Sequence, residues 1–282
     1  MVSEIRMVGR PRSAKPALGE IDPPGHHVGS VQALDRGLTL LAIIAEADGL
    51  SLTTIAQRAG IAASTAHRIL TTLKAAGFVQ CDEARGGYLI GVKAFKVGSA
   101  FLRNRKLVDV GRGIIRQLME SSGETASIAI EKDDSVVFIS QMESHNAIRA
   151  FHRPGARGQL HASSLGKAML ASLSDEAVLQ KLHRIGMQKF TEHTIVDPAA
   201  LLADLGLSRK RGWTVDDEER AEGMRCIGAA VYNEYGETMG AISVSGPLVR
   251  MSDERLGELG PMVKRAAAEI TEGIGGIIPK HS

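Results

Sequence analysis

The chain has few cysteines, no long apolar run and no secretory signal, and each shortage excludes a class of protein. Only two of its 282 residues are cysteines, Cys81 and Cys226, and they lie far apart. A disulfide framework is therefore excluded, and a cytoplasmic location is expected. The apolar stretch at residues 38–45 is much shorter than the roughly 18 residues that a membrane span needs. Residues 1–16 are polar and lack the apolar core of a signal peptide.

The sequence also has little net charge and no familiar catalytic motif. A formal net charge of +2 is too small to indicate nucleic-acid binding, so any such binding must come from a local arrangement of basic residues. The motifs GxSxG, GxxxxGK[ST], HExxH and GxGxxG before a helix are all absent. Histidines occur without metal-ligand spacing, at His145, His152, His161, His183 and His193. We therefore expect no enzyme, no metal site and no cofactor.

The length of the chain predicts about two domains, because 282 residues are many for one hydrophobic core. Residues 1–30 are rich in proline, glycine and charge and show no hydrophobic periodicity, which predicts a disordered arm. Basic residues of this arm could touch a phosphate backbone, although a solvated tail is the simpler interpretation.

Residues 52–76, LTTIAQRAGIAASTAHRILTTLKAA, have the pattern of two short helices joined by a tight turn. Apolar residues recur at three- and four-residue spacing, and Gly60 lies between the two runs, where a left-handed backbone costs little. Ser64 and Thr65 are expected to open the second helix, with serine as its N-cap. This pattern is typical of a helix-turn-helix, whose second helix enters the major groove. An ordinary pair of core helices is the alternative, because the motif is loose.

The flanking residues favour the DNA-binding alternative. Before the motif, residues 34–45 repeat apolar side chains at helical spacing and predict a first helix. After it, the apolar runs at residues 78–81 and 88–90 surround a polar, glycine-rich turn and predict a β-hairpin. Three helices followed by a hairpin make a winged helix-turn-helix.

One side of the expected second helix carries polar residues suited to DNA. Short hydroxyls can contact phosphates and arginine can contact base edges, and no acid lies among them. At the hairpin tip, Arg85 is placed to reach a minor groove or a phosphate. A solvated helix face is the alternative. The expected DNA-binding residues are Ser64, Thr65, His67, Arg68, Thr71 and Arg85.

The remainder of the chain predicts a linker helix and an α+β domain. Residues 92–116 have helical periodicity and a basic side, and the apolar side of this helix could pair with a second copy. Beyond Gly123, strand-like and helical segments follow one another, which favours an antiparallel sheet with helices. Strands are expected at residues 126–131, 136–141, 147–152, 227–232 and 239–244, and helices at 165–173, 198–210 and 255–270.

Polar candidates for a ligand site gather in short stretches of this second half. Ser243 and Ser245 are two residues apart on an expected strand, so their side chains point to the same face. A helix that starts near Ser163 or Ser164 would offer free backbone N–H groups to an anion. No base lies beside a nucleophile, so a pocket for a small polar ligand fits better than an active site. The alternative is that the serines lie on the outer face of the sheet.

Four stretches carry a resemblance to a known family: LTTIAQRAGIAASTAHRILTTLKAAGFV, HASSLGKAMLA, RGWTVDDEERAEGMRCIGAAVYN and GAISVSGP. Through them the chain resembles the IclR family of bacterial transcriptional regulators over nearly all its length after residue 30. The resemblance implies an α+β fold. It consists of a winged helix-turn-helix at residues 31–92, a linker helix at residues 93–110 and a GAF-like antiparallel effector-binding domain at residues 111–282. Such proteins are typically homodimers or dimers of dimers.

The resemblance also implies which residues hold an effector. In members that sense small keto acids such as glyoxylate or pyruvate, side chains of one Asp, one Cys and two Ser contact the ligand, together with two backbone N–H groups. The matching positions here are Asp216, Cys226, Ser243 and Ser245, with the N–H groups of Ser164 and Leu165. Such members usually have small residues at both of the last two positions, so the bulk of Leu165 puts the identity of the ligand in doubt.

These inferences together predict a ligand-responsive transcriptional repressor that binds double-stranded operator DNA and a small oxo- or hydroxy-carboxylate. A buried aspartate that faces an anion is costly, so we expect Asp216 to bond to the oxo or hydroxyl group of the ligand. The alternatives are an activator that responds to an aromatic or larger acid, an enzyme that acts on a small oxo acid, and an architectural DNA-binding protein. No membrane partner is expected.

Overall fold

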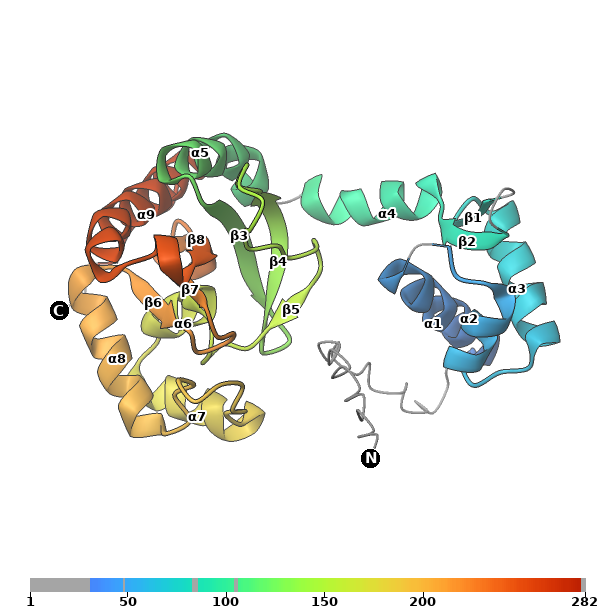
Figure 1. The fold of residues 1–282 in the computed structure, drawn as a ribbon, viewed down its shortest axis with the longest axis horizontal. Coiled ribbons are helices and arrows are strands. Elements are labelled where there is room, and N and C mark those ends of the chain that lie inside the picture. The colour runs from blue at the N-terminus through green and yellow to red at the C-terminus, as the bar shows by residue number, and fades with distance from the viewer. Residues whose placement is uncertain (1–30, 48, 83–85, 104–105, 280–282) are drawn as a thin grey trace, which may run out of the picture. The chain divides into compact units, whose positions relative to one another are not determined.

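The computed structural model describes residues 31–47, 49–82, 86–103 and 106–279, and the chain divides into two compact units between Val97 and Gly98. Figure 1 shows the elements of each unit. The predicted arm at residues 1–30 lies outside the described residues. No helix in the described ranges is both long enough and apolar enough to cross a membrane.

The first unit is a winged helix-turn-helix, as predicted. Its core is formed by apolar residues at helical spacing, among them Leu40, Ile44, Ile55 and Leu70, each at most 2% exposed. Gly60 has a φ of +63° in the turn between the second and third helices, which a glycine adopts without strain. The elements are α1 (Gln32–Glu46), α2 (Leu52–Arg58), α3 (Ala63–Ala75), β1 (Val79–Asp82) and β2 (Gly87–Ile90).

Both strands of the hairpin pack against the helices, β1 against α3 and β2 against α1. Strands β1 and β2 pair antiparallel, with Val79 opposite Ile90 and Asp82 opposite Gly87. A side chain at Gly87 would collide with the backbone of Gly49, whose carbonyl oxygen would lie 2.4 Å from the added Cβ. The absence of a side chain therefore lets the strand lie close to the loop between α1 and α2.

The predicted N-cap of the recognition helix is wrong. Helix α3 begins at Ala63, and its N-cap is Ala62, which makes no side-chain capping bond. Ser64 therefore lies inside the first turn. The start of α3 is fixed instead by packing in the preceding turn, since Ile61 contacts the core of this unit. A serine cap does occur at α2, where the Ser51 hydroxyl accepts the N–H of Thr54 at 3.2 Å.

Two helices occupy the range in which one helix, at residues 92–116, was predicted. Helix α4 spans Val92–Arg103 and helix α5 spans Lys106–Ser122. The apolar residues of α5 face the sheet of the second unit, with Leu107 and Ile115 fully buried. Residues from 106 onward therefore belong to the core of the second unit.

The second unit contains a six-stranded antiparallel sheet, and the predicted α+β class is confirmed. The strand order is β5-β4-β3-β8-β7-β6, so that the first and last long strands, β3 and β8, pair at the centre. The strands are β3 (Thr125–Lys132), β4 (Ser135–Met142), β5 (Arg157–Gly158), β6 (Thr214–Asp217), β7 (Met224–Tyr232) and β8 (Thr238–Pro247).

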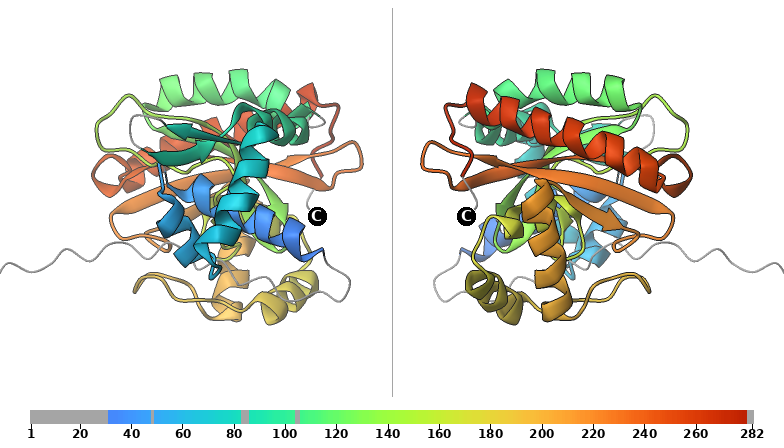
Figure 2. Two further views of the ribbon diagram at one scale, coloured as in Figure 1. Left: turned by 90° about the vertical axis from the view of Figure 1, so that its right-hand side faces the viewer. Right: turned by 90° about the vertical axis from the view of Figure 1, so that its left-hand side faces the viewer.

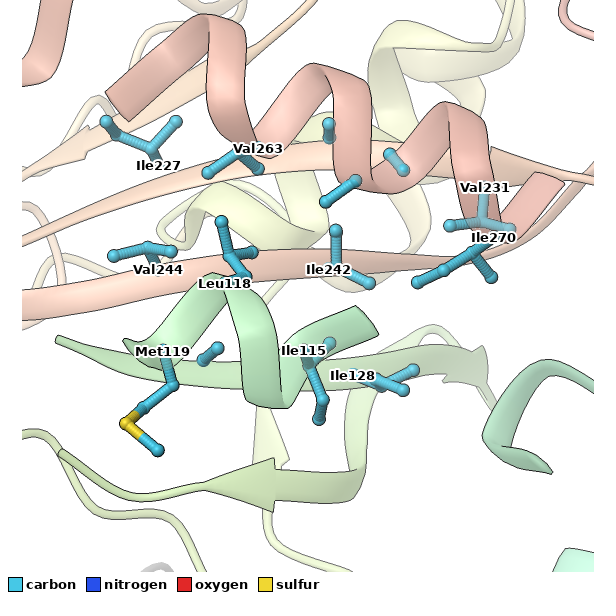
Figure 3. Close-up of a cluster of buried hydrophobic side chains, with 14 of the residues drawn as sticks. Ile115, Leu118, Met119, Ile128, Ile227, Val231, Ile242, Val244, Val263 and Ile270 are labelled. Atoms are coloured by element: carbon cyan, nitrogen blue, oxygen red, sulfur yellow. The ribbon is translucent and has the colours of Figure 1, made fainter. Parts of the chain in front are cut away.

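Helices cover both faces of this sheet. On one face, α5 and α9 (Asp253–Gly273) enclose an apolar core; on the other lie α6 (Ser164–Ala171), α7 (Asp175–Ile185) and α8 (Pro198–Arg211) (Figure 2). Figure 3 shows Ile242 and Val244 of β8 in one apolar cluster with side chains of α5 and α9. Side chains alternate between the two faces along a strand. Ser243, between Ile242 and Val244, and Ser245, directly after Val244, therefore face the α6 side of the sheet. The alternative that these serines lie on an outer face is thereby excluded.

One predicted strand is wrong, and strands β5 and β6 and helix α7 were not predicted. Residues 147–152 form no strand, because side chains rather than a strand partner hold this segment. The hydroxyl of Thr125 donates to the carbonyl of Ala150 at 2.9 Å, and Arg250 donates to that of Ile148 at 2.8 Å. Only the two-residue strand β5 pairs with the outer edge of β4. Helix α7 and strand β6 were not predicted, the latter because its acidic residues conceal the alternation.

Candidate functional site

A cavity of about 320 Å³ lies on the α6 side of the sheet in the second unit. Residues from β4, β5, α6, β6, β7 and β8 line it, together with the segment at residues 149–152. Every residue that the sequence predicts for an effector site is among them: Ser164, Leu165, Asp216, Cys226, Ser243 and Ser245. Residues separated by up to 81 positions in the numbering are thus brought to one cavity.

Three neighbouring strands supply the polar side chains of the cavity. In the strand register, Asp216 lies opposite Cys226, and Cys226 lies opposite Ser245, so the three side chains form a row across β6, β7 and β8. Ser243 is two residues away on the same face. Its hydroxyl is buried and has no hydrogen-bond partner among the described residues. Buried hydroxyls are normally paired, so this oxygen is available to a ligand. We call these four residues the polar floor.

The N-terminus of α6 reaches the same cavity. The hydroxyl of Ser163 caps this helix by accepting the N–H of Gly166 at 3.1 Å. The preceding N–H groups, those of Ser164 and Leu165, lie in the first turn, where an α-helix has no internal acceptors for them. Such N–H groups and the helix dipole favour an anion. The side chain of Leu165 is 2% exposed and packs in the apolar cluster beneath α6.

Two small contacts hold α6 against the sheet. Gly228 lies so close that an added Cβ would be 2.6 Å from the carbonyl oxygen of Ser164. Thr214 donates its hydroxyl to the same oxygen at 2.6 Å. The first turn of α6 is therefore positioned by β6 and β7, which also carry Asp216 and Cys226.

Asp216 and Cys226 have altered acidities in this setting. Asp216 is 4% exposed, and burial raises the pKa of its carboxyl to about 6, against the opposing charge of Lys167 and the N–H groups of Glu219 and Arg220. Near neutral pH this carboxyl can accept a hydrogen bond, and after protonation it can donate one. Burial also raises the pKa of the Cys226 thiol, which is therefore neutral.

A buried ionic cluster lies next to the polar floor, and sequence reasoning missed its role. Lys167 of α6 is 1% exposed, and its Nζ lies 2.5 Å from Oε1 of Glu219 and 2.9 Å from Oδ2 of Asp204. Burial opposes the charged form of Lys167, but the two acids raise its pKa above the usual value. Burial likewise raises the pKa of Glu219 to about 7, against the effect of Lys167. A lysine within an apolar helix was the available signal, because a buried lysine requires an acid partner.

Aromatic and basic side chains, among them Phe138, His152 and Arg220, also line the cavity, and the sequence did not predict them. His152 stacks on Phe138 with ring centroids 4.1 Å apart. The guanidinium carbon of Arg220 lies 4.1 Å from the ring centroid of Phe190. Burial, aided by the charge of Arg220, lowers the pKa of His152. No group of three or more potential metal ligands occurs in the part of the chain that the structure describes.

The predicted DNA-binding residues lie on α3 of the first unit. Ser64, His67, Arg68 and Thr71 are exposed, and Thr65 is half-buried. Thr71 donates its hydroxyl to the carbonyl of His67 at 2.8 Å, which leaves the hydroxyl oxygen free to accept another bond. Arg85 lies outside the described residues. Sequence reasoning did not select Arg36 of α1, although it lines a shallow hollow together with Arg68.

Both units match models of one family. The model described as "IclR helix-turn-helix domain" matches residues 33–83, and "Bacterial transcriptional regulator IclR C-terminal" matches residues 99–272. The chain is 45% identical over 274 residues to the HTH-type transcriptional regulator BhcR of Paracoccus denitrificans, covering 97% of this chain and 96% of that protein.

A second relative and a solved structure agree with the family match. The transcriptional repressor IclR of Escherichia coli is 44% identical over 269 residues, covering 94% of this chain and 97% of the relative. The crystal structure of Thermotoga maritima IclR has a TM-score of 0.77 and 26% identity, covering 86% of this chain and 99% of that one. The chain therefore belongs to the IclR family, whose members are DNA-binding transcriptional regulators that sense small-molecule effectors, and not enzymes.

Proposed function

We propose that this protein is a repressor that binds operator DNA through α3 and the hairpin, and that a carboxylic acid with an oxo or hydroxy group controls this binding. The observation that carries the proposal is the unpaired hydroxyl of Ser243 in a polar floor beside the N-terminus of α6. Serine hydroxyls and free N–H groups both donate hydrogen bonds, and a carboxylate accepts several of them.

The oxo or hydroxy group of the effector pairs with Asp216. The backbone N–H groups of Glu219 and Arg220 engage only Oδ1 of this carboxyl, at 2.9 and 3.4 Å. Its Oδ2 accepts a hydrogen bond from a ligand hydroxyl or, when the carboxyl is protonated, donates a hydrogen bond to a ligand oxo group. An acid without such a group would leave a buried carboxyl beside its own carboxylate, which is unfavourable.

DNA recognition uses the exposed, acid-free face of α3. Arg68 and His67 contact base edges in this proposal, Ser64, Thr65 and Thr71 contact phosphates or bases, and Arg85 reaches the backbone or minor groove. Helix-turn-helix proteins generally read paired half-sites as dimers, so we assign the active form as a homodimer or a dimer of dimers. Operator binding places the protein in the cytoplasm.

We infer that the protein represses transcription and does not activate it. Several relatives carry the word repressor in their names, among them the Escherichia coli protein and the "Acetate operon repressor" of Salmonella typhimurium, which is 44% identical over 251 residues. The effector shifts the population between arrangements of the oligomer that fit the operator differently. A coupling free energy of about 1–3 kcal/mol, typical of such systems, changes operator affinity roughly 5- to 150-fold.

The test is a gel-shift experiment on DNA upstream of this gene and its neighbours, with and without a panel of oxo and hydroxy acids. We expect a retarded complex that one acid of the panel weakens. An acid that strengthens the complex would make the protein an activator or a co-repressed regulator. A complex that no acid alters would contradict effector control.

A further inference from the structure

The cavity has more space than the smallest acids that fit the polar floor would fill. A volume of about 320 Å³ has room for roughly ten water molecules at ~30 Å³ each. A two- or three-carbon oxo acid occupies the space of only a few waters. If such an acid were bound at Ser243 and Ser245, most of the cavity would be left to solvent.

A second set of unpaired polar groups lines the same cavity, apart from the polar floor. Nδ1 of His152 and Oε1 of Gln159 are buried and have no partner among the described residues. The lowered pKa of His152 keeps its ring neutral, and a neutral imidazole can donate from one ring nitrogen to a carboxylate. The backbone N–H of His152 is bonded to the side chain of Gln141 at 3.0 Å, which fixes the position of this residue.

Arg220 is the cation of the cavity wall that lacks an acid partner. Three arginines line the cavity, and two are engaged: Arg149 by Glu143 at 2.8 Å and Arg157 by Asp133 at 3.1 Å. Arg220 forms no ion pair with any residue in the described ranges; instead, its guanidinium lies over the ring of Phe190. This contact orients the guanidinium, and its charge lies near enough to His152 to act on that ring. An unpaired arginine in a cavity attracts an anion.

Building on the function proposed above, we propose that the effector carries a second acidic group and is an oxo or hydroxy dicarboxylic acid of about four to six carbons. One carboxylate binds the hydroxyls of Ser243 and Ser245 and the first turn of α6. The other binds Arg220 and His152. Apolar side chains of the cavity, among them Phe138 and Met224, contact the carbon chain between the two ends.

The experiment compares acids on the full-length protein by thermal shift and titration calorimetry. The panel consists of glyoxylate, pyruvate, 2-oxoglutarate, 2-hydroxyglutarate, glutarate and 4-hydroxybenzoate. A charge-assisted pair adds about 10- to 100-fold in affinity, so we expect 2-oxoglutarate or 2-hydroxyglutarate to bind that much more tightly than pyruvate. Glutarate, which lacks the oxo group, should bind more weakly than either.

A substitution separates the second subsite from the first. Arg220→Gln should reduce the affinity for 2-oxoglutarate about 10- to 100-fold more than it reduces the affinity for pyruvate. Arg265→Gln is the matched control, because Arg265 is exposed on α9, on the other face of the sheet. The ranking of acids on the unmodified protein tests the proposal even if Arg220→Gln does not fold.

The outcomes distinguish this proposal from the function on which it rests. Binding of glyoxylate, pyruvate or 4-hydroxybenzoate at least as tight as that of every dicarboxylate, with release of operator DNA, would overturn the dicarboxylate assignment and leave the proposed function in place. An equal loss for 2-oxoglutarate and pyruvate in Arg220→Gln would overturn the role of Arg220. If no oxo or hydroxy acid binds, both proposals fail.

Discussion

Lys167 and Glu219 form an ion pair with 2.5 Å between Nζ and Oε1, and both side chains are at least 95% buried. The pair joins α6 to the loop after β6. Glu219 donates its backbone N–H to Asp216, so one residue links the buried lysine to the polar floor. The cluster therefore fixes α6 and Asp216 relative to each other.

Replacing the buried lysine should cost much of the stability of the second unit. Lys167→Met leaves Glu219 and Asp204 without their cation, and removal of one partner from a buried pair costs about 3–5 kcal/mol. The loss of unfolding free energy in Lys167→Met should be smaller at pH 6 than at pH 8, because Glu219, with a pKa of about 7, can take up a proton and become neutral. Urea unfolding at the two pH values measures it. Lys189→Met, which removes an exposed pair with Glu192, should cost less than about 1 kcal/mol.

The buried carboxyl of Asp216 should make stability fall as pH rises. Its pKa is raised from 3.8 to about 6, so between these values the folded state binds more protons than the unfolded state. The contribution of Asp216 to the free energy of unfolding is therefore largest below pH 3.8. It decreases by about 3 kcal/mol as the pH rises through the folded-state pKa of about 6. Asp216→Asn keeps an acceptor for the N–H of Glu219 and should remove this decrease.

The measurement is the difference in unfolding free energy between the two proteins from pH 4 to pH 8. Glu219 also has a raised pKa, about 7, to which the charge of Asp216 contributes, so the difference between the two proteins reports Asp216 together with its effect on Glu219. Curves that run parallel across this range would show that Asp216 is ionised throughout. The affinity for an oxo acid should also weaken above pH 6 in the unmodified protein, because only the protonated carboxyl of Asp216 can donate a hydrogen bond to the oxo group.

Loss of the guanidinium on α3 should weaken operator binding without unfolding the first unit. Arg68 is exposed, so Arg68→Ala removes no core packing. A base contact by arginine is worth about 1–3 kcal/mol, which predicts a loss of roughly 5- to 150-fold in specific affinity. Fluorescence anisotropy with an operator and a scrambled duplex measures it. Lys74→Ala, in the last turn of the same helix, is the control; an equal loss in both variants would indicate a general charge effect.

The two serines of β8 should be required for the effector response and dispensable for DNA binding. Ser243→Ala with Ser245→Ala removes two hydroxyl donors, each worth about 1.5–3 kcal/mol toward a carboxylate, so effector affinity should fall at least ~100-fold. Operator affinity without effector should not change. Val244→Ala is the control, because Val244 faces the opposite core; it should lose about 1–3 kcal/mol of stability and keep the response. A response retained in the double variant would move the pocket elsewhere.

Local patterns predicted much of this fold, and long-range pairing accounts for most of what they missed. Alternation along β8 was sufficient to place Ser243 and Ser245 on one face, and helical spacing predicted the core of the first unit. The ion pair of Lys167 with Glu219 joins residues 52 positions apart, and no spacing rule relates them. The wrong strand at residues 147–152 has the same origin, because Thr125 and Arg250 determine that segment from elsewhere in the chain.

The central pairing of β3 with β8 has a consequence for synthesis of the chain. Thr125 pairs with Ser245, so the middle of the sheet cannot form until nearly the whole chain has left the ribosome. The elements of the first unit, by contrast, all lie between Gln32 and Ile90 and are complete by Ile90. Domains fold in order as they emerge, and local contacts form fastest. The DNA-binding unit should therefore be folded while the sensing unit is still being translated, and a nascent chain arrested before β8 should hold a folded helix-turn-helix that has no sensor.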